Sequence, residues 1–121
     1  MYSAQVLDHF ERPRNAGLLE AADAMAKLSN PACGDTLQLM AKLSEGRIAE
    51  IHFLAKGCVA SMACGSALTE LTAGRTIAEA RALSRDDLLK AVGGLPPASM
   101  HATHLALDTL RALLDQLQTK A

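Results

Sequence analysis

The chain has 121 residues, 12 basic and 13 acidic side chains, a formal net charge of -1, and Tyr2, Phe10 and Phe53 as its only aromatic residues. This length suits one domain, and the near-neutral charge excludes nucleic acid and a polybasic membrane patch as expected partners. No apolar run approaches the roughly 18–20 residues of a membrane span, and the N-terminus lacks a signal-peptide core. We therefore expect a single cytoplasmic domain over residues 1–121 with an aliphatic core.

Hydrophobic periodicity and capping residues predict a helix, then strands, then more helices. The link Ser44-Glu45-Gly46 is typical of a hairpin turn, and the change of period after Gly57 indicates a helix that Gly74 ends. The predicted elements are a helix over 2–10, strands over 25–30, 36–43 and 47–55, helices over 59–73, 76–82 and 84–91, and a last helix ending near 118. The predicted fold class is α+β: a small antiparallel three-stranded sheet packed against helices, with a long C-terminal helix.

The last helix carries an apolar stripe and, beside it, a polar row. His104 lies in the polar row, four residues before Asp108, so we interpret it as part of a solvated face. His101 stands at the start of the helix after Pro96 and Pro97, where its ring can turn toward a neighbouring loop. The sequence therefore makes His101, and not His104, a candidate metal ligand.

Three cysteines cannot pair among themselves, so in a reducing cytosol they indicate thiol or metal chemistry. Between Cys33 and Asp35, Gly34 lets the backbone bend so that a thiolate and a carboxylate can face one centre. The alternative is that Asp35 is a turn residue and Cys33 a buried small hydrophobe.

Of the other two cysteines, Cys58 flanks the predicted helix after Gly57 and Cys64 lies within it. Cys58 precedes that helix, where unpaired backbone N–H groups favour a thiolate over a thiol. Cys64 lies about 240° further round, so the two thiols do not easily address one small site. We interpret Cys64 as a packed helix residue, with a resolving or spare thiol as the alternative.

Four segments occur in order over nearly the whole chain: YSAQVLDHFERPRNAG at 2–17, PACGD at 31–35, KGC at 56–58, and LPP followed by a histidine at 95–101. In this order and at these distances they resemble the IscU/NifU-type iron–sulfur cluster assembly scaffold proteins, a family that includes SufU-type sulfur-transfer proteins. The resemblance implies a scaffold, not an enzyme, that binds iron or a labile [2Fe-2S] cluster and passes it on. It implies that the ligands are Cys33, Asp35, Cys58 and His101.

The chain departs from the family pattern at two places. The third ligand motif of the family is His-Cys, whereas here His101 is followed by Ala102, which removes a thiolate that helps to hold the cluster and accepts sulfur. The chaperone-recognition sequence Leu-Pro-Pro-Val-Lys keeps its first three residues, but Ala98 and Ser99 replace the last two. Two sulfurs, one nitrogen and one oxygen suit a tetrahedral zinc ion in the same site and should hold a cluster more weakly.

The expected partners follow from this resemblance. They are a cysteine desulfurase, apo acceptor proteins and, through the altered motif, an Hsp70-type chaperone system, with the chain itself a monomer or weak homo-oligomer. One alternative function is a zinc-binding sulfur carrier or regulator of the same pathway. A second alternative is a small thiol-redox protein that uses Cys58 and Cys64.

Overall fold

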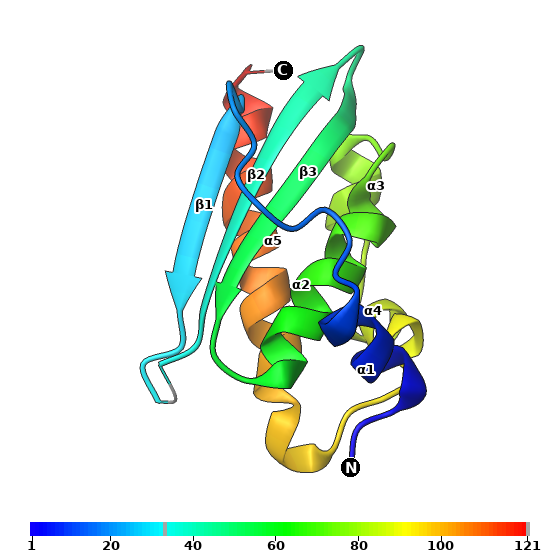
Figure 1. Ribbon diagram of the computed structural model, residues 1–121. Helices are drawn as coiled ribbons and strands as arrows, with labels where there is room; N and C mark the ends of the chain where they lie inside the picture. The colour runs from blue at the N-terminus through cyan, green and yellow to red at the C-terminus, as the bar shows by residue number, and fades with distance from the viewer. Residues whose placement is uncertain (33, 121) are drawn as a thin grey trace.

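The structure, a computed structural model, describes residues 1–32 and 34–120 (Figure 1). Its elements are α1 Ala4–Glu11, β1 Ala24–Ser29, β2 Thr36–Ser44, β3 Arg47–Lys56, α2 Val59–Thr72, α3 Ile77–Arg81, α4 Arg85–Ala91, the 3-10 turn η1 Pro97–Ser99, and α5 His101–Lys120. The α+β class, the antiparallel three-stranded sheet and the long last helix are confirmed, with small differences at the ends of the elements.

The strands follow one another in the sheet in the order β1-β2-β3. Glu45 and Gly46 link β2 to β3 with φ angles of 53° and 77°. Positive φ at both central residues matches the twist of a two-residue hairpin, as the sequence predicted. At the other end of the hairpin Thr36 pairs with Lys56, so the start of β2 lies beside the end of β3. This pairing brings the residues just before β2 close to those just after β3.

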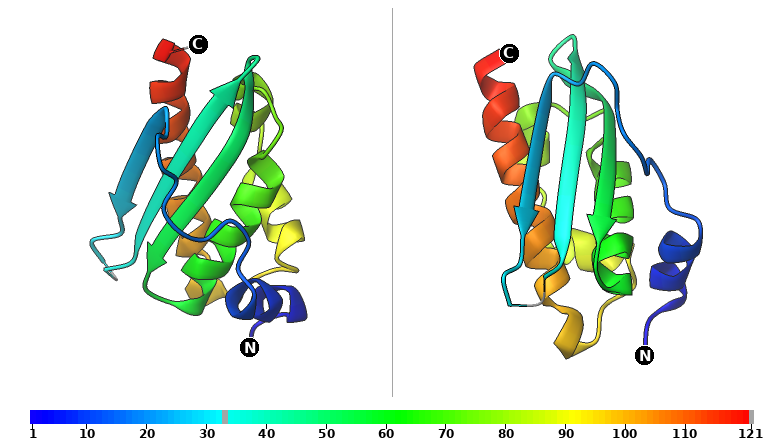
Figure 2. Two further views of the ribbon diagram at one scale, coloured as in Figure 1. Left: turned by 45° about the horizontal axis from the view of Figure 1, so that its top comes forward. Right: turned by 60° about the vertical axis from the view of Figure 1, so that its left-hand side comes forward.

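The helices α2 and α5 cover one face of the sheet, and the segment between α1 and β1 crosses the other face (Figures 1 and 2). Phe53 of β3 donates its backbone N–H to the Asn15 carbonyl, which ties that segment to the sheet. Small residues let α2 approach the sheet closely, since a Cβ added at Gly65 would lie 2.7 Å from the Phe53 ring. The backbone of α2 at Gly65 therefore packs directly against a large side chain of the sheet, which leaves little empty space in the core.

The helix α5 buries the apolar stripe that the sequence predicted. The buried side chains of that stripe are Thr103, Ala106, Leu107, Leu110, Leu113, Leu114 and Leu117. The polar row beside it, which includes His104 and Asp108, is exposed. Within the described residues, no helix combines the length and the apolar character needed to cross a bilayer.

Polar contacts attach α1 to α2. His9 is buried, with its Nδ1 2.7 Å from the Ser66 hydroxyl and its Nε2 3.7 Å from a Glu70 carboxylate oxygen. Burial lowers the pKa of His9 below its ordinary value, and the nearby Arg14 guanidinium lowers it further, while Glu70 and Asp8 act in the opposite direction. The folded protein therefore favours the neutral imidazole at this contact.

We predict that His9 makes the stability of the protein depend on pH just below neutrality. Because the pKa of His9 is lower in the folded chain than in the unfolded chain, the unfolded chain binds more protons as the pH falls below about 6.5. Stability should therefore fall from pH 7.5 to pH 5.5 in urea unfolding, and His9→Gln should show a smaller fall over the same range. Equal pH slopes in the two proteins would contradict this.

Candidate functional site

Three of the residues singled out in the sequence meet at one end of the sheet. Asp35 immediately precedes β2, Cys58 is the residue before α2, and His101 is the first residue of α5. This is the lower end of the molecule in Figure 1, where β3 ends and α2 and α5 begin. Cys33, the fourth predicted ligand, lies outside the described residues.

The Asp35 carboxylate oxygen Oδ2 is at the centre of the group. It lies 3.2 Å from Cys58 Sγ and 3.3 Å from His101 Nε2, and those two atoms are 4.0 Å apart. Ligands of a tetrahedral zinc ion lie ~3.3–3.8 Å from one another, given bonds of ~2.0–2.3 Å. The observed distances of 3.2, 3.3 and 4.0 Å lie within a few tenths of an ångström of this range, so small side-chain shifts bring the three atoms to the spacing of a single metal centre.

A fourth side chain, Ser61, contacts the same carboxylate oxygen. Its hydroxyl donates to Asp35 Oδ2 at 2.6 Å and lies 3.4 Å from Cys58 Sγ. Sequence reasoning missed this residue. The signal that was available is its spacing, because Ser61 follows Cys58 by three residues and such a pair lies on one side of a helix.

The His101 ring is oriented by the turn before α5. Its Nδ1 lies 3.1 Å from the Ala98 carbonyl oxygen in η1. In the tautomer where Nδ1–H donates to that carbonyl, the lone pair of Nε2 faces Asp35 and Cys58. A backbone carbonyl behind a histidine ring is a usual way of fixing a metal-binding tautomer.

Two loops place the carboxylate and the thiol. Asn30 closes the first loop: its side chain accepts the Ala32 N–H, and its own N–H donates to the Asp35 carbonyl at 2.8 Å. In the second loop Gly57 has a φ of 132°, and an added Cβ there would lie 2.1 Å from Asp35 Oδ1. Only glycine at 57 allows the chain to pass so close to the carboxylate on its way to Cys58.

Cys64 does not belong to this group. It is fully buried in the core, and burial together with the nearby Cys58 raises its pKa to about 12. A buried thiol of such high pKa is a poor nucleophile. This confirms the packed-helix interpretation and disfavours a redox pair of Cys58 and Cys64.

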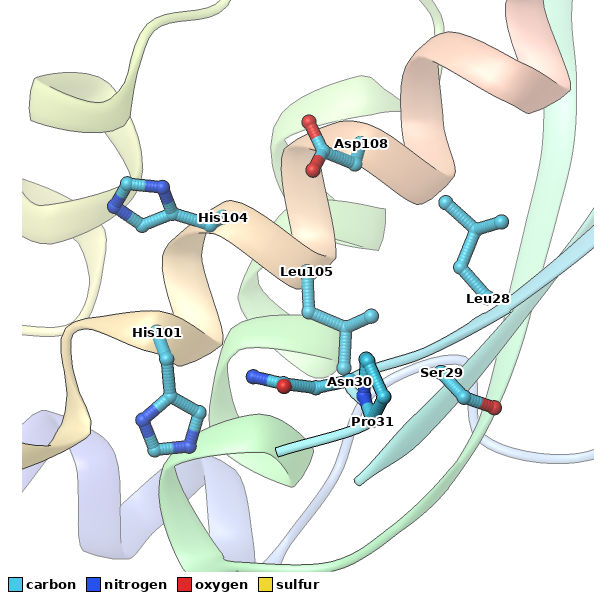
Figure 3. Close-up of a pocket in the computed structure, with 8 residues that line it drawn as sticks. All are labelled: Leu28, Ser29, Asn30, Pro31, His101, His104, Leu105 and Asp108. Atoms are coloured by element: carbon cyan, nitrogen blue, oxygen red, sulfur yellow. The ribbon is translucent and has the colours of Figure 1, made fainter. Parts of the chain in front are cut away.

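His101 also lines a pocket of about 530 Å³ between α5 and the loop after β1 (Figure 3). His104 lines the pocket too, but its ring nitrogen Nε2 lies 3.5 Å from the exposed Arg85 guanidinium, and Asp108 pairs with Arg111. The placement of His104 on an exposed face is therefore confirmed. Ala102, next to His101, turns inward and is 1% exposed in the hydrophobic core.

Comparison with known proteins places this chain among relatives. The profile of the family described as NifU-like N terminal domain matches residues 1–121. The chain belongs to this family. The structure resembles that of a nitrogen-fixing NifU-like protein (N-terminal) from Brucella abortus, with a TM-score of 0.81, 21% identity, and coverage of 98% of this chain and 95% of that one.

Curated relatives of this NifU-like chain have higher identity. The iron-sulfur cluster assembly scaffold protein IscU 1 of Archaeoglobus fulgidus is 45% identical over 116 residues, which are 95% of this chain and 76% of that protein. The protein of Escherichia coli named iron-sulfur cluster assembly scaffold protein IscU is 34% identical over 123 residues, covering 98% and 95% of the two chains. The resemblance found in the sequence is thus confirmed.

We predict that Gly57→Ala disrupts the site and destabilises the protein. The left-handed φ alone should cost roughly 1–3 kcal/mol, and the added methyl group must also displace Asp35. Gly46→Ala is the matched control, because its φ is 77° but an added Cβ meets no described atom within 4 Å. Urea unfolding should show a lower free energy of unfolding in both variants, because both positions have a positive φ. Co²⁺ titration should show a loss of metal affinity only in Gly57→Ala, and equal metal affinity in the two variants would count against the contact with Asp35.

Proposed function

We propose that this chain is a scaffold for iron–sulfur cluster assembly, which binds iron or a labile [2Fe-2S] cluster as cargo and passes it on. The observation that carries the proposal is the convergence of Asp35, Cys58 and His101, whose candidate ligand atoms lie within 4.8 Å of one another. The relatives named as scaffold proteins supply the class of cargo. On this proposal the chain stores and hands on a cluster and has no turnover of its own.

The proposed ligands are Cys33, Asp35, Cys58 and His101. They offer two thiolates, one imidazole and one carboxylate, and hard carboxylate oxygen is a weaker partner for a cluster than thiolate sulfur. Weak binding suits cargo that must leave. The half-buried Cys58 and His101 keep the group accessible, whereas the buried Asp35 forms its floor.

A zinc ion is the second candidate occupant of the same site. The specific observation in its favour is that one sulfur, one nitrogen and one oxygen lie 3.2–4.0 Å apart, within a few tenths of an ångström of the spacing in tetrahedral zinc coordination. A zinc-bound form would act as a sulfur carrier or regulator of the same pathway. Stoichiometric zinc in protein purified from cells, with no cluster after reconstitution, would favour this second function.

The proposed partners follow from the scaffold function. A cysteine desulfurase would supply sulfur at the end of the molecule that carries Cys58 and His101, and apo acceptor proteins would receive the cluster there. The segment Leu95–Ser99 is the proposed contact of an Hsp70-type chaperone system. We further propose that residues 1–121 act as one domain, as a monomer or weak homo-oligomer in the cytoplasm.

The first test of the scaffold function is anaerobic reconstitution with iron, sulfide and a cysteine desulfurase. Visible absorption should appear in the wild-type chain and be lost in Cys33→Ser and Cys58→Ser, because each removes a soft ligand. Cys64→Ala is the control, since Cys64 is buried away from the site, and it should keep the absorption. A colourless wild-type product would refute the scaffold function.

The second test restores the missing thiol. The Ala102 methyl group packs into the core one residue from His101, so a cysteine there must turn its longer side chain toward the site to bind. With that thiol bound, Ala102→Cys should slow cluster loss to a chelator by about 10-fold or more, since an added metal–thiolate bond worth about 1.4 kcal/mol already gives that factor. Ala106→Cys is the matched control, because it adds the same sulfur one turn further along α5 at an equally buried position. If both variants lose the cluster at the wild-type rate, the site is not a scaffold centre lacking one ligand.

A further inference from the structure

Ser61 has an unusual role for a serine in the first turn of a helix. Cys58 occupies the N-cap position of α2 but makes no side-chain capping hydrogen bond, and the Ser61 side chain does not return to the helix backbone. The Ser61 hydroxyl instead reaches across to Asp35, in the loop before β2. Ser61 is 3% exposed, and the described contacts of its hydroxyl are with Asp35 Oδ2 and Cys58 Sγ.

The direction of this hydrogen bond follows from the chemistry of the two groups. An ionised carboxylate only accepts hydrogen bonds, whereas a serine hydroxyl has one proton to donate. At 2.6 Å the Ser61 hydroxyl donates to Asp35 Oδ2. That oxygen is the same atom that faces Cys58 Sγ and His101 Nε2.

Among the described residues, Cys58, Ser61 and His101 thus contact Asp35 Oδ2. Metal binding would involve the first and the last directly, but not Ser61. A metal binds the thiolate form of cysteine and the lone pair of a neutral imidazole nitrogen, so Cys58 Sγ and His101 Nε2 would bind it without a proton. The Ser61 hydroxyl keeps its proton. A carboxylate oxygen can accept this hydrogen bond with one lone pair and bind a metal with the other.

We infer that Ser61 is a positioning residue that holds the Asp35 carboxylate in its metal-binding orientation. Ser61 is not itself a ligand; it acts through Asp35. This inference rests on the proposed function, because it requires that Asp35 binds the metal. Hydrogen-bond partners that orient a ligand usually change metal affinity by about 10–100-fold when they are removed.

A double-mutant cycle separates this role from a merely structural one. The probe is Co²⁺, added to the folded chain without a cluster, and the measured quantities are its dissociation constant and its visible d–d spectrum. Ser61→Ala should weaken binding about 10–100-fold and give a spectrum that resembles that of Asp35→Ala. In an Asp35→Ala background, Ser61→Ala should change the dissociation constant less than about 2-fold, because the group it positions is absent.

Two further variants serve as controls. Ser66→Ala removes a buried hydroxyl from the same helix at a place where it contacts His9, and it should leave Co²⁺ affinity unchanged. Ser61→Thr keeps the hydroxyl and should bind Co²⁺ nearly as the wild type does. If Ser61→Ala fails to fold, the comparison of Ser61→Thr with Ser61→Val makes the same test, because these two side chains have the same shape and differ in the hydroxyl.

The results distinguish this inference from the proposed function. Tight Co²⁺ binding that is unchanged in Ser61→Ala, or weakened equally with and without Asp35, overturns the positioning role and leaves the metal site intact. Failure of the wild-type chain to bind Co²⁺ overturns the site itself, and the positioning role with it.

Discussion

A buried carboxylate, Asp35, lies at the centre of the candidate site and holds together the end of the protein that carries it. The Asp35 side chain is 6% exposed, and a carboxylate removed from water is costly unless hydrogen bonds compensate it. Ser61, Cys58 and His101 all place a polar atom within 3.3 Å of its Oδ2. Because these partners come from two different helices, the same contacts that satisfy the carboxylate also join the ends of α2 and α5 to the sheet.

The topology explains why the site forms at this end and from these residues. The antiparallel pairing of Thr36 with Lys56 places the entrance to β2 beside the exit from β3. The chain then passes through Gly57 beside the Asp35 carboxylate before α2 begins. A side chain at position 57 would clash with that carboxylate, so Asp35 can occupy its place only if residue 57 is glycine. The third side chain, His101, follows the turn η1, and the Ala98 carbonyl in that turn orients the His101 ring.

Much of this arrangement could be predicted from the sequence because its signals are local. The hairpin turn at Glu45 and Gly46 requires positive φ angles, and the stripe of leucines in α5 has a helical period, so both were predicted correctly. The motifs around Asp35, Cys58 and His101 indicated which residues should meet. The spacing of Ser61 from Cys58 places the two on one side of the helix, but Ser61 was missed because its role depends on Asp35, 26 residues away, and that contact does not follow from the spacing.

The burial of Ala102 could not be predicted from the local sequence either. Its neighbour His101 is directed to the site while Ala102 packs into the core, and only the placement of α5 against the sheet determines this difference. The sequence could say that a thiol expected by resemblance is missing. The structure adds that, among the described residues, a thiol sulfur and an imidazole nitrogen lie beside one carboxylate oxygen.

We propose that sulfur, nitrogen and oxygen atoms at this end of the sheet bind one metal centre. X-ray absorption of the zinc-loaded chain tests it most directly, because zinc–sulfur bonds of about 2.3 Å separate clearly from zinc–nitrogen or zinc–oxygen bonds of about 2.0–2.1 Å. The expected result is a mixed coordination shell, with sulfur from Cys33 and Cys58 and nitrogen or oxygen from His101 and Asp35. A shell of light atoms alone would contradict it.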